Sequence, residues 1–238
     1  MSNNFESFIA EFNKLHDVLK EKSNNSSKFV DFRRLIDELE NNSVVKKHKK
    51  QLHLIRELRN ILVHEKKDSK YNLAEPSSEL INDMIEIRNQ IEYPTKVNKI
   101  FKNHVQCFKA EDNLKDVLNY IKDKSYTQFP VFDQNEFLGL VSDNGITFWL
   151  SEVIKEEIVD LSEVKIADVI GHDENRMNYV TIKADMSLYN VDELFSRRIR
   201  NGERGVVLLI TALGKIEKPE DIIGIITPWD LPKINEIL

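Results

Sequence analysis

The sequence predicts an α+β protein in which an N-terminal all-α helical bundle is followed by two copies of one α/β unit. Two observations predict this fold class. Apolar residues recur at helical spacing through about the first 93 residues. Further on, residues 137–142 (Phe-Leu-Gly-Leu-Val-Ser) reappear as residues 222–227 (Ile-Ile-Gly-Ile-Ile-Thr), and residues 109–114 reappear as residues 183–188. Such a repeat indicates two packed copies of a supersecondary unit, with a ligand cleft between them.

Composition narrows the class of protein. The chain has 238 residues, of which 41% are hydrophobic and 31% charged, enough for two domains that each bury a core. A single cysteine, Cys107, excludes an intramolecular disulfide and a multi-cysteine zinc site, and we expect no metal. We find no apolar stretch of about 18 residues and no secretion signal in residues 1–6, so we expect a cytoplasmic protein without a membrane partner.

Charge is distributed unevenly between the two halves. Residues 97–238 carry 17 Lys and Arg against 24 Asp and Glu, whereas residues 1–96 carry 17 against 16. An acidic repeat half is poorly suited to nonspecific nucleic-acid binding. Any contact with RNA is therefore expected from the N-terminal half.

Four helices are expected in that half, separated by polar or proline-containing breaks. They cover residues 5–19, residues 29–39, residues 44–65 and a segment that begins behind Pro76-Ser77-Ser78-Glu79 and ends before Tyr93. Pro94 biases Tyr93 away from helical geometry. We therefore assign residues 1–94 to a small bundle and residues 95–102 to a linker.

The third of these helices has two distinct faces. Its apolar face is expected to comprise Leu54, Ile55, Leu58, Ile61 and Leu62. The opposite side carries His53, Arg56, Asn60 and His64, with Arg59 at a flank. Arg59 and His64 lie about 140° apart around the helix axis. One helix cannot aim both at one atom, so cooperation between them would require a dimer interface.

The segment Arg59-Asn60-Ile61-Leu62-Val63-His64 resembles the Arg-x-x-x-x-His signature of HEPN domains. The resemblance implies a homodimer and a metal-independent ribonuclease built from Arg56, Arg59, Asn60 and His64. His64 would move protons at the RNA 2′-hydroxyl and leaving oxygen, and Arg59 would stabilise charge on the phosphate. Alternatively, Arg59 packs its stem over the bundle edge and His64 lies near a helix end.

A basic cluster precedes the apolar face of the same helix. Residues 46–50 read Lys-Lys-His-Lys-Lys. They could guide RNA toward a cleft, or they could form an ordinary solvated helix face.

The C-terminal half predicts the same element order twice. We expect strands at residues 105–108, 129–132 and 137–141 with a helix at 114–122, and then strands at residues 179–182, 205–210 and 222–226 with a helix at 188–200. In each unit, one more helix follows the last strand. We assign residues 103–160 to the first unit and residues 161–238 to the second.

These units resemble a tandem pair of CBS domains, or Bateman module. The resemblance rests on residues 129–133 (Phe-Pro-Val-Phe-Asp) followed by residues 139–142 (Gly-Leu-Val-Ser), and on residues 224–230 (Gly-Ile-Ile-Thr-Pro-Trp-Asp), which match Gly-h-h-[Ser/Thr]-x-x-[Asp/Asn]. It implies an adenosine-containing regulatory ligand, namely AMP, ADP, ATP, S-adenosylmethionine or cyclic di-AMP, with no other cofactor required. It also implies a homodimer.

By this resemblance, Thr227 and Asp230 would hold the ribose hydroxyls, and the strand near Thr181 would contact adenine by its backbone. A carboxylate at a helix start can accept two vicinal hydroxyl hydrogen bonds. In the first copy Ser142 fits the pattern, but Gly145 stands where the ribose-binding Asp is expected. The alternative for Thr227 and Asp230 is a simple helix N-cap.

Two further sets of residues have open interpretations. The basic residues of the helix at 188–200 and the following turn could pair with phosphates or form a solvated helix end; they are Arg197, Arg198, Arg200 and Arg204. Trp149 and Trp229 begin equivalent helices and are expected to pack at an interface between repeats or protomers.

These observations predict a regulatory sensor, in which an adenine nucleotide bound to the paired units modulates the helical domain. A nucleotide-gated ribonuclease and a ligand-free interaction scaffold are the alternatives.

Overall fold

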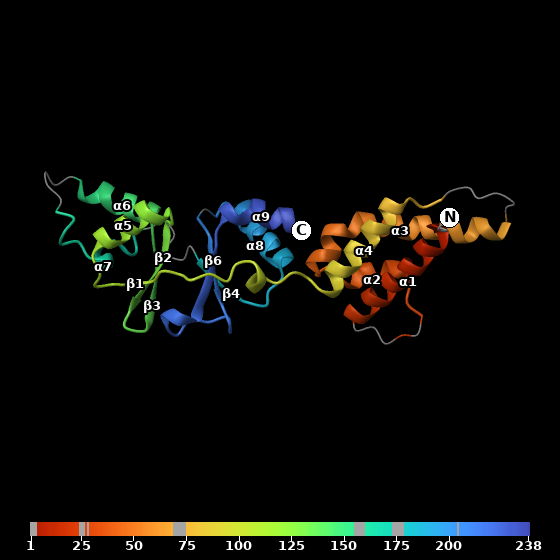
Figure 1. Cartoon of the computed structure of the whole chain (residues 1–238), viewed down its shortest axis with the longest axis horizontal. Helices are drawn as coiled ribbons and strands as arrows, with labels where there is room; N and C mark the ends of the chain where they lie inside the picture. Colours follow the sequence, from red (N-terminus) through yellow and green to blue (C-terminus); the bar gives the residue numbers. More distant parts are fainter. Residues whose placement is uncertain are drawn as a thin grey trace. The chain divides into compact units, whose positions relative to one another are not determined.

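The computed structural model describes residues 4–23, 27, 29–68, 75–154, 160–172, 179–203 and 205–238, with side chains of 64–68 not included. It divides into two compact units, Met1–Thr95 and Lys96–Leu238, which are described separately below (Figure 1). The first unit is helical and the second contains two α/β sheets, which confirms the predicted α+β class. Within the described ranges, no helix has the length and apolar character needed to cross a membrane.

The first unit contains the four expected helices. They are α1 (Asn4–Lys22), α2 (Phe32–Glu38), α3 (Ser43–Asp68) and α4 (Ser78–Glu92) (Figure 1). Asp31 caps α2 by accepting a 2.8 Å hydrogen bond from the Arg33 amide, and Ser77 caps α4 in the same way. Phe29 was expected inside the second helix. It instead precedes the Asp31 cap and is 86% exposed.

A buried ion pair joins the first and last helices of this unit. Glu11 of α1 is only 4% exposed, and its Oε1 accepts a hydrogen bond from Arg88 Nε of α4. Arg88 Nη1 also donates to Glu92 Oε2 at 3.2 Å. The hydrogen bond with Glu11 raises the pKa of the Arg88 guanidinium above its ordinary value. Each charge therefore depends strongly on its partner, because the remaining contacts, Arg88 with Glu92 and Glu11 with the exposed Lys14, compensate the charge only in part.

The second unit contains two three-stranded sheets of identical topology. The first consists of β1 (Phe108–Lys109), β2 (Gln128–Asp133) and β3 (Glu136–Ser142), and the second of β4 (Tyr179–Lys183), β5 (Val207–Thr211) and β6 (Ile222–Ile226). In each sheet the middle strand pairs parallel with the first strand and antiparallel with the third. Both middle strands have a bulge at the same point, after Val131 and after Ile210. The sequence repeat thus corresponds to two copies of one structural unit.

Helices complete both repeats. They are α5 (Leu114–Lys124), α6 (Asp143–Val153) and α7 (Ile166–Val169) in the first, and α8 (Leu188–Arg200) and α9 (Leu231–Ile237) in the second, with short 3-10 helices η1 (Val97–Lys99), η2 (Pro219–Asp221) and η3 (Pro228–Asp230). Figure 1 shows α5 and α6 beside the first sheet, and α8 and α9 beside the second. Between the sheets lies one shared apolar cluster, formed by Phe132, Leu140, Val207, Leu209 and Ile222.

The helix α7 was not expected, and it belongs to the first repeat. Ile166 and Val169 are buried in the core of that repeat. The Ile166 amide donates to Asp112 O at 3.0 Å, and the Leu114 amide donates to Val164 O at 2.9 Å. The first repeat therefore continues past residue 161, where we expected the second to begin, because these backbone bonds hold the segment against α5.

The segment of residues 96–106, here called the crossing segment, packs on the second repeat. Residues 95–102 were expected to form a linker, yet Val97 and Phe101 are buried in the core of the second repeat. The Val97 amide donates to Met186 O at 2.9 Å, and the Asn103 amide donates to Ile223 O at 3.1 Å. The segment passes so close to β6 that a Cβ on Gly224 would lie 2.0 Å from Phe101 O. Only glycine fits at that crossing.

Candidate functional site

A pocket of about 390 Å³ lies between the two repeats of the second unit. We call it the inter-repeat pocket. Its wall comes from the crossing segment (Phe101, Asn103, His104, Val105, Gln106), from the turn into β2 and its start (Ser125, Tyr126, Thr127, Gln128, Phe129), and from the end of β6 and the helices that follow (Ile225, Thr227, Trp229, Asp230, Lys233). This volume is within the range of small-molecule sites.

Thr227 and Asp230 line this pocket together. The Thr227 amide donates to Asp230 Oδ2 at 2.8 Å, and the Thr227 hydroxyl donates to the same oxygen at 3.1 Å. One carboxylate oxygen therefore caps the start of η3, as the alternative interpretation predicted. Among the described residues, the other oxygen, Oδ1, makes no hydrogen bond. The cap thus orients the carboxylate and leaves one oxygen able to accept a hydrogen bond from a ligand.

Gln128 contributes an unsatisfied acceptor to the opposite wall. It is the first residue of β2, and its Oε1 is buried without a hydrogen-bond partner among the described residues. A buried polar atom without a partner costs about 1–3 kcal/mol. A hydrogen-bond donor brought by a ligand would remove that cost if the amide turned its Oε1 toward the pocket. The sequence analysis missed Gln128, and the one signal that could have found it is its place directly before the Phe129-Pro130 pair.

Charge in the pocket is sparse and balanced. In the part of the chain that the structure describes, Lys233 and Asp230 are the only Lys, Arg, Asp or Glu residues that line it. Lys233 Nζ lies 5.0 Å from the centre of the Phe101 ring, a cation–π contact. Trp229, four residues before Lys233, is 89% exposed. It does not pack at an interface within this unit, whereas Trp149 is buried in the core of the first repeat.

The other expected ligand residues lie elsewhere in the second unit. Thr181 lies in the edge strand β4, where it pairs with Leu209 of β5, and it does not line the inter-repeat pocket. Ser142 is 1% exposed and caps α6 by accepting a 2.9 Å hydrogen bond from the Gly145 amide. The crossing segment lines the pocket with Asp230, whereas no residue of β4 does.

The basic residues of α8 do not reach this pocket. Arg198 forms an ion pair with Glu203 at the end of α8. None of Arg197, Arg198 and Arg200 lines the inter-repeat pocket, and Arg204 lies outside the described residues. Among the residues that the structure describes, Lys233 is therefore the only lysine or arginine that this pocket offers to an anionic ligand.

In the first unit, Arg59 packs against its own bundle. Its guanidinium carbon lies 5.5 Å from the centre of the Phe12 ring, and Nη1 donates to Asn60 Oδ1 at 3.3 Å. This is the alternative in which the arginine stem covers the bundle edge. Arg56 is half-buried, and the His64 side chain lies outside the described part. The resemblance to HEPN domains therefore stays a prediction.

The buried face of α3 differs from the expected one. Leu54 and Ile61 are 60% and 53% exposed, while Leu52, Ile55 and Leu62 are buried. The helix is rotated relative to the expected face because Val44, Val45 and Leu52 also pack inward. In the basic cluster that precedes this face, Lys49 forms an ion pair with Asp37 at 3.7 Å, and His48 Nδ1 lies 2.6 Å from Gln51 Oε1.

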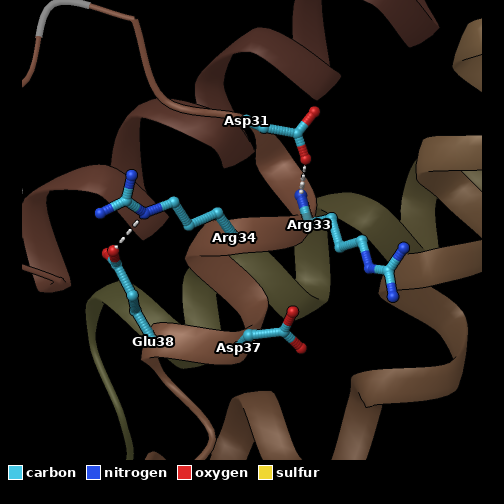
Figure 2. A pocket seen from close by; sticks show the side chains of 5 residues that line it. All are labelled: Asp31, Arg33, Arg34, Asp37 and Glu38. Atoms are coloured by element: carbon cyan, nitrogen blue, oxygen red, sulfur yellow. Dashed lines mark hydrogen bonds and ion pairs between the residues drawn. The ribbon is translucent and has the colours of Figure 1, made fainter.

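A hollow of about 440 Å³ lies on the surface of α2. Its lining residues are Asp31, Arg33, Arg34, Asp37 and Glu38. Figure 2 shows Arg34 directed at Glu38, 2.8 Å away, and Asp31 directed at the Arg33 backbone. Asp37 pairs with Lys49. Because Asp31, Arg34 and Asp37 are each held in a local cap or ion pair, the hollow is typical of a charged helix surface.

Comparison with known protein families gives a match within the second unit. The CBS-domain family model matches residues 97–152, from η1 through most of α6. Similar solved structures include the protein CBSX2 in complex with AMP (19% identity, TM-score 0.40, covering 60% of this chain and 96% of that one). A second is the CBS domain of a bacterial CNNM/CorC family Mg²⁺ transporter in complex with ATP (17% identity, TM-score 0.40, covering 59% of this chain and 86% of that one). A third is the CBS domains of a transcriptional regulator from Streptococcus pneumoniae (15% identity, TM-score 0.39, covering 58% of this chain and 98% of that one).

Comparison with curated protein sequences gave no match. The family match covers the crossing segment and the first repeat up to α6, where the resemblance to CBS domains was expected. Residues 97–152 therefore form a CBS domain.

Proposed function

We propose that this protein is a regulatory sensor whose inter-repeat pocket binds an adenosine-containing nucleotide and thereby modulates the N-terminal helical unit. The observation that carries the proposal is Asp230. Its Oδ2 is fixed by Thr227, and its Oδ1 can accept charge-assisted hydrogen bonds from the vicinal hydroxyls of a ribose. In this account the cap positions the carboxylate for its ligand.

Gln128 supports adenine as the base. Its buried Oε1 needs a donor, and the exocyclic amine of adenine is one. Guanine presents a carbonyl oxygen at the corresponding position, so Gln128 would have to turn its amide over and donate from Nε2 instead. The backbone of the crossing segment, at Asn103 and Val105, supplies further polar groups along the same wall.

The crossing segment is the proposed route of regulation. It lines the pocket through Asn103 and His104, and it directly follows Thr95, the last residue of the helical unit. A ligand that contacts this segment would favour the conformations that bind it best. The helical unit would then respond through the chain that leads into it. A homodimer remains the expected assembly, and a ribonuclease is not favoured because Arg59 packs on Phe12.

A thermal-shift screen with adenosine-containing and guanosine-containing nucleotides tests this proposal. A ligand at about 100 times its Kd adds roughly 2.7 kcal/mol, which raises Tm by a few degrees. We expect such a rise with at least one adenosine compound and not with its guanosine counterpart. The rise should disappear in Asp230→Ala.

The matched control is Asp143→Ala, which removes an exposed aspartate at the start of the corresponding helix in the first repeat. This variant should keep the ligand-induced rise. If the ligand raises Tm in Asp230→Ala as much as in the original chain, the ligand binds at a site that does not include Asp230. No rise with any adenosine compound, in protein free of co-purified nucleotide, would leave the interaction scaffold as the better account.

A further inference from the structure

The composition of the inter-repeat pocket limits the charge of its ligand. Of the lining residues within the described ranges, Lys233 is the one permanent cation and Asp230 the one permanent anion. His104, also on the wall, adds an imidazole but no permanent charge. Residues 97–238 carry seven more acidic than basic residues, so the surrounding field is also negative. A ligand with several phosphates would meet one ammonium group and a repulsive environment.

The position of Lys233 fits a single phosphate next to the ribose. Asp230 and Lys233 are three residues apart across the start of α9, so their side chains lie on the same side of that helix. The cation–π contact with Phe101, at 5.0 Å, holds the ammonium group at the pocket wall. The ammonium is thus near the carboxylate that would bind the ribose hydroxyls.

We propose that the inter-repeat pocket selects an adenosine ligand with one phosphate over the triphosphate, and that Lys233 binds this phosphate. The inference rests on the proposed function. Beyond that function, it names the ligand as a monophosphate and Lys233 as the residue that selects it. Each phosphate beyond the first adds negative charge that no lysine or arginine of the pocket neutralises.

Titration calorimetry of the full chain with adenosine, AMP and ATP, in buffer with EDTA, tests this inference. We expect AMP to bind about tenfold more tightly than adenosine, the gain of one charge-assisted hydrogen bond. We also expect AMP to bind at least about tenfold more tightly than ATP. Lys233→Gln should reduce the affinity for AMP to that for adenosine, while its affinity for adenosine stays unchanged.

Lys115→Gln, which removes an exposed lysine of α5 outside the pocket, is the charge-matched control and should bind all three ligands as the original chain does. Tight binding of both AMP and ATP would overturn the inference while the proposed function stands. Equal loss of adenosine and AMP affinity in Lys233→Gln would also overturn it, since Lys233 would then support the pocket instead of the phosphate. If no adenosine compound binds, both the proposed function and this inference fail.

Discussion

Replacing Glu11 with alanine is expected to lower the free energy of unfolding of the helical unit by about 3–5 kcal/mol, because it leaves the Arg88 charge partly buried without its main partner. Arg88 donates to both Glu11 and Glu92, but Glu11 is the more deeply buried of the two carboxylates. Its side chain is 5% exposed against 27% for Glu92. The loss should therefore far exceed that from a surface ion pair.

Urea unfolding followed by two optical signals isolates this effect. Both tryptophans, Trp149 and Trp229, lie in the second unit, so their fluorescence reports on that unit alone. Glu11→Ala should shift the far-ultraviolet circular dichroism transition to lower urea while leaving the fluorescence transition in place. Arg34→Ala, which removes the exposed 2.8 Å pair with Glu38, should cost no more than about 0.5 kcal/mol.

A double variant separates the charge effect from lost packing. Glu11→Leu combined with Arg88→Met replaces both charges with apolar side chains, and it should regain most of the lost stability, because a buried pair can be replaced by hydrophobic residues at little cost. If the double variant is as unstable as Glu11→Ala, the ion pair does not explain the loss.

Gly224→Ala is expected to destabilise the second unit by about 3 kcal/mol or more, at the upper end of overpacking effects. The added Cβ would lie 2.0 Å from Phe101 O and 2.8 Å from Ile210 Cδ1. The first of these atoms is backbone and cannot rotate away, so the crossing segment must move off β6. Because Phe101 and Asn103 line the inter-repeat pocket, nucleotide binding should weaken in the same variant.

Tryptophan fluorescence during urea unfolding measures this loss, since both indoles lie in the affected unit. Leu213→Ala, a larger change in side-chain size at a residue 72% exposed in the β5–β6 connection, should alter stability by no more than about 0.5 kcal/mol. A Gly224→Ala protein with unchanged stability and unchanged binding would show that the crossing segment can shift freely, contrary to the packing described above.

Local patterns in the sequence predicted the helices and strands better than they predicted which of these elements pack against one another. The apolar periodicity of α1 and the repeat around Gly139 and Gly224 reflect side-chain burial within single elements, so the sequence alone could predict these elements. The burial of Val97 and Phe101 could not be predicted in this way, because it depends on packing with residues more than 80 positions further along the chain. The face of α3 was misjudged for the same reason. Which stripe is buried depends on the neighbouring helices.

The candidate site was half predicted. Thr227 and Asp230 lie together because they are three residues apart at a strand-to-helix turn, a relation that sequence fixes locally. Thr181 was assigned from the resemblance to CBS domains, and it does not line this pocket. The pocket instead combines the second repeat with Gln128 and the crossing segment, a pairing set by how the repeats pack.

The most direct test of the central claim, that Asp230 holds the ribose of an adenosine nucleotide, is a comparison of AMP and 2′-deoxy-AMP affinities for the original chain and for Asp230→Asn. The account predicts that removing either the 2′-hydroxyl or the carboxylate charge weakens binding by about tenfold or more, the worth of a hydrogen bond to a charged group. In Asp230→Asn, removal of the 2′-hydroxyl should then cost little further, because the two changes remove the same interaction. If 2′-deoxy-AMP is weakened by the same factor in both proteins, Asp230 does not bind the ribose and the account is contradicted.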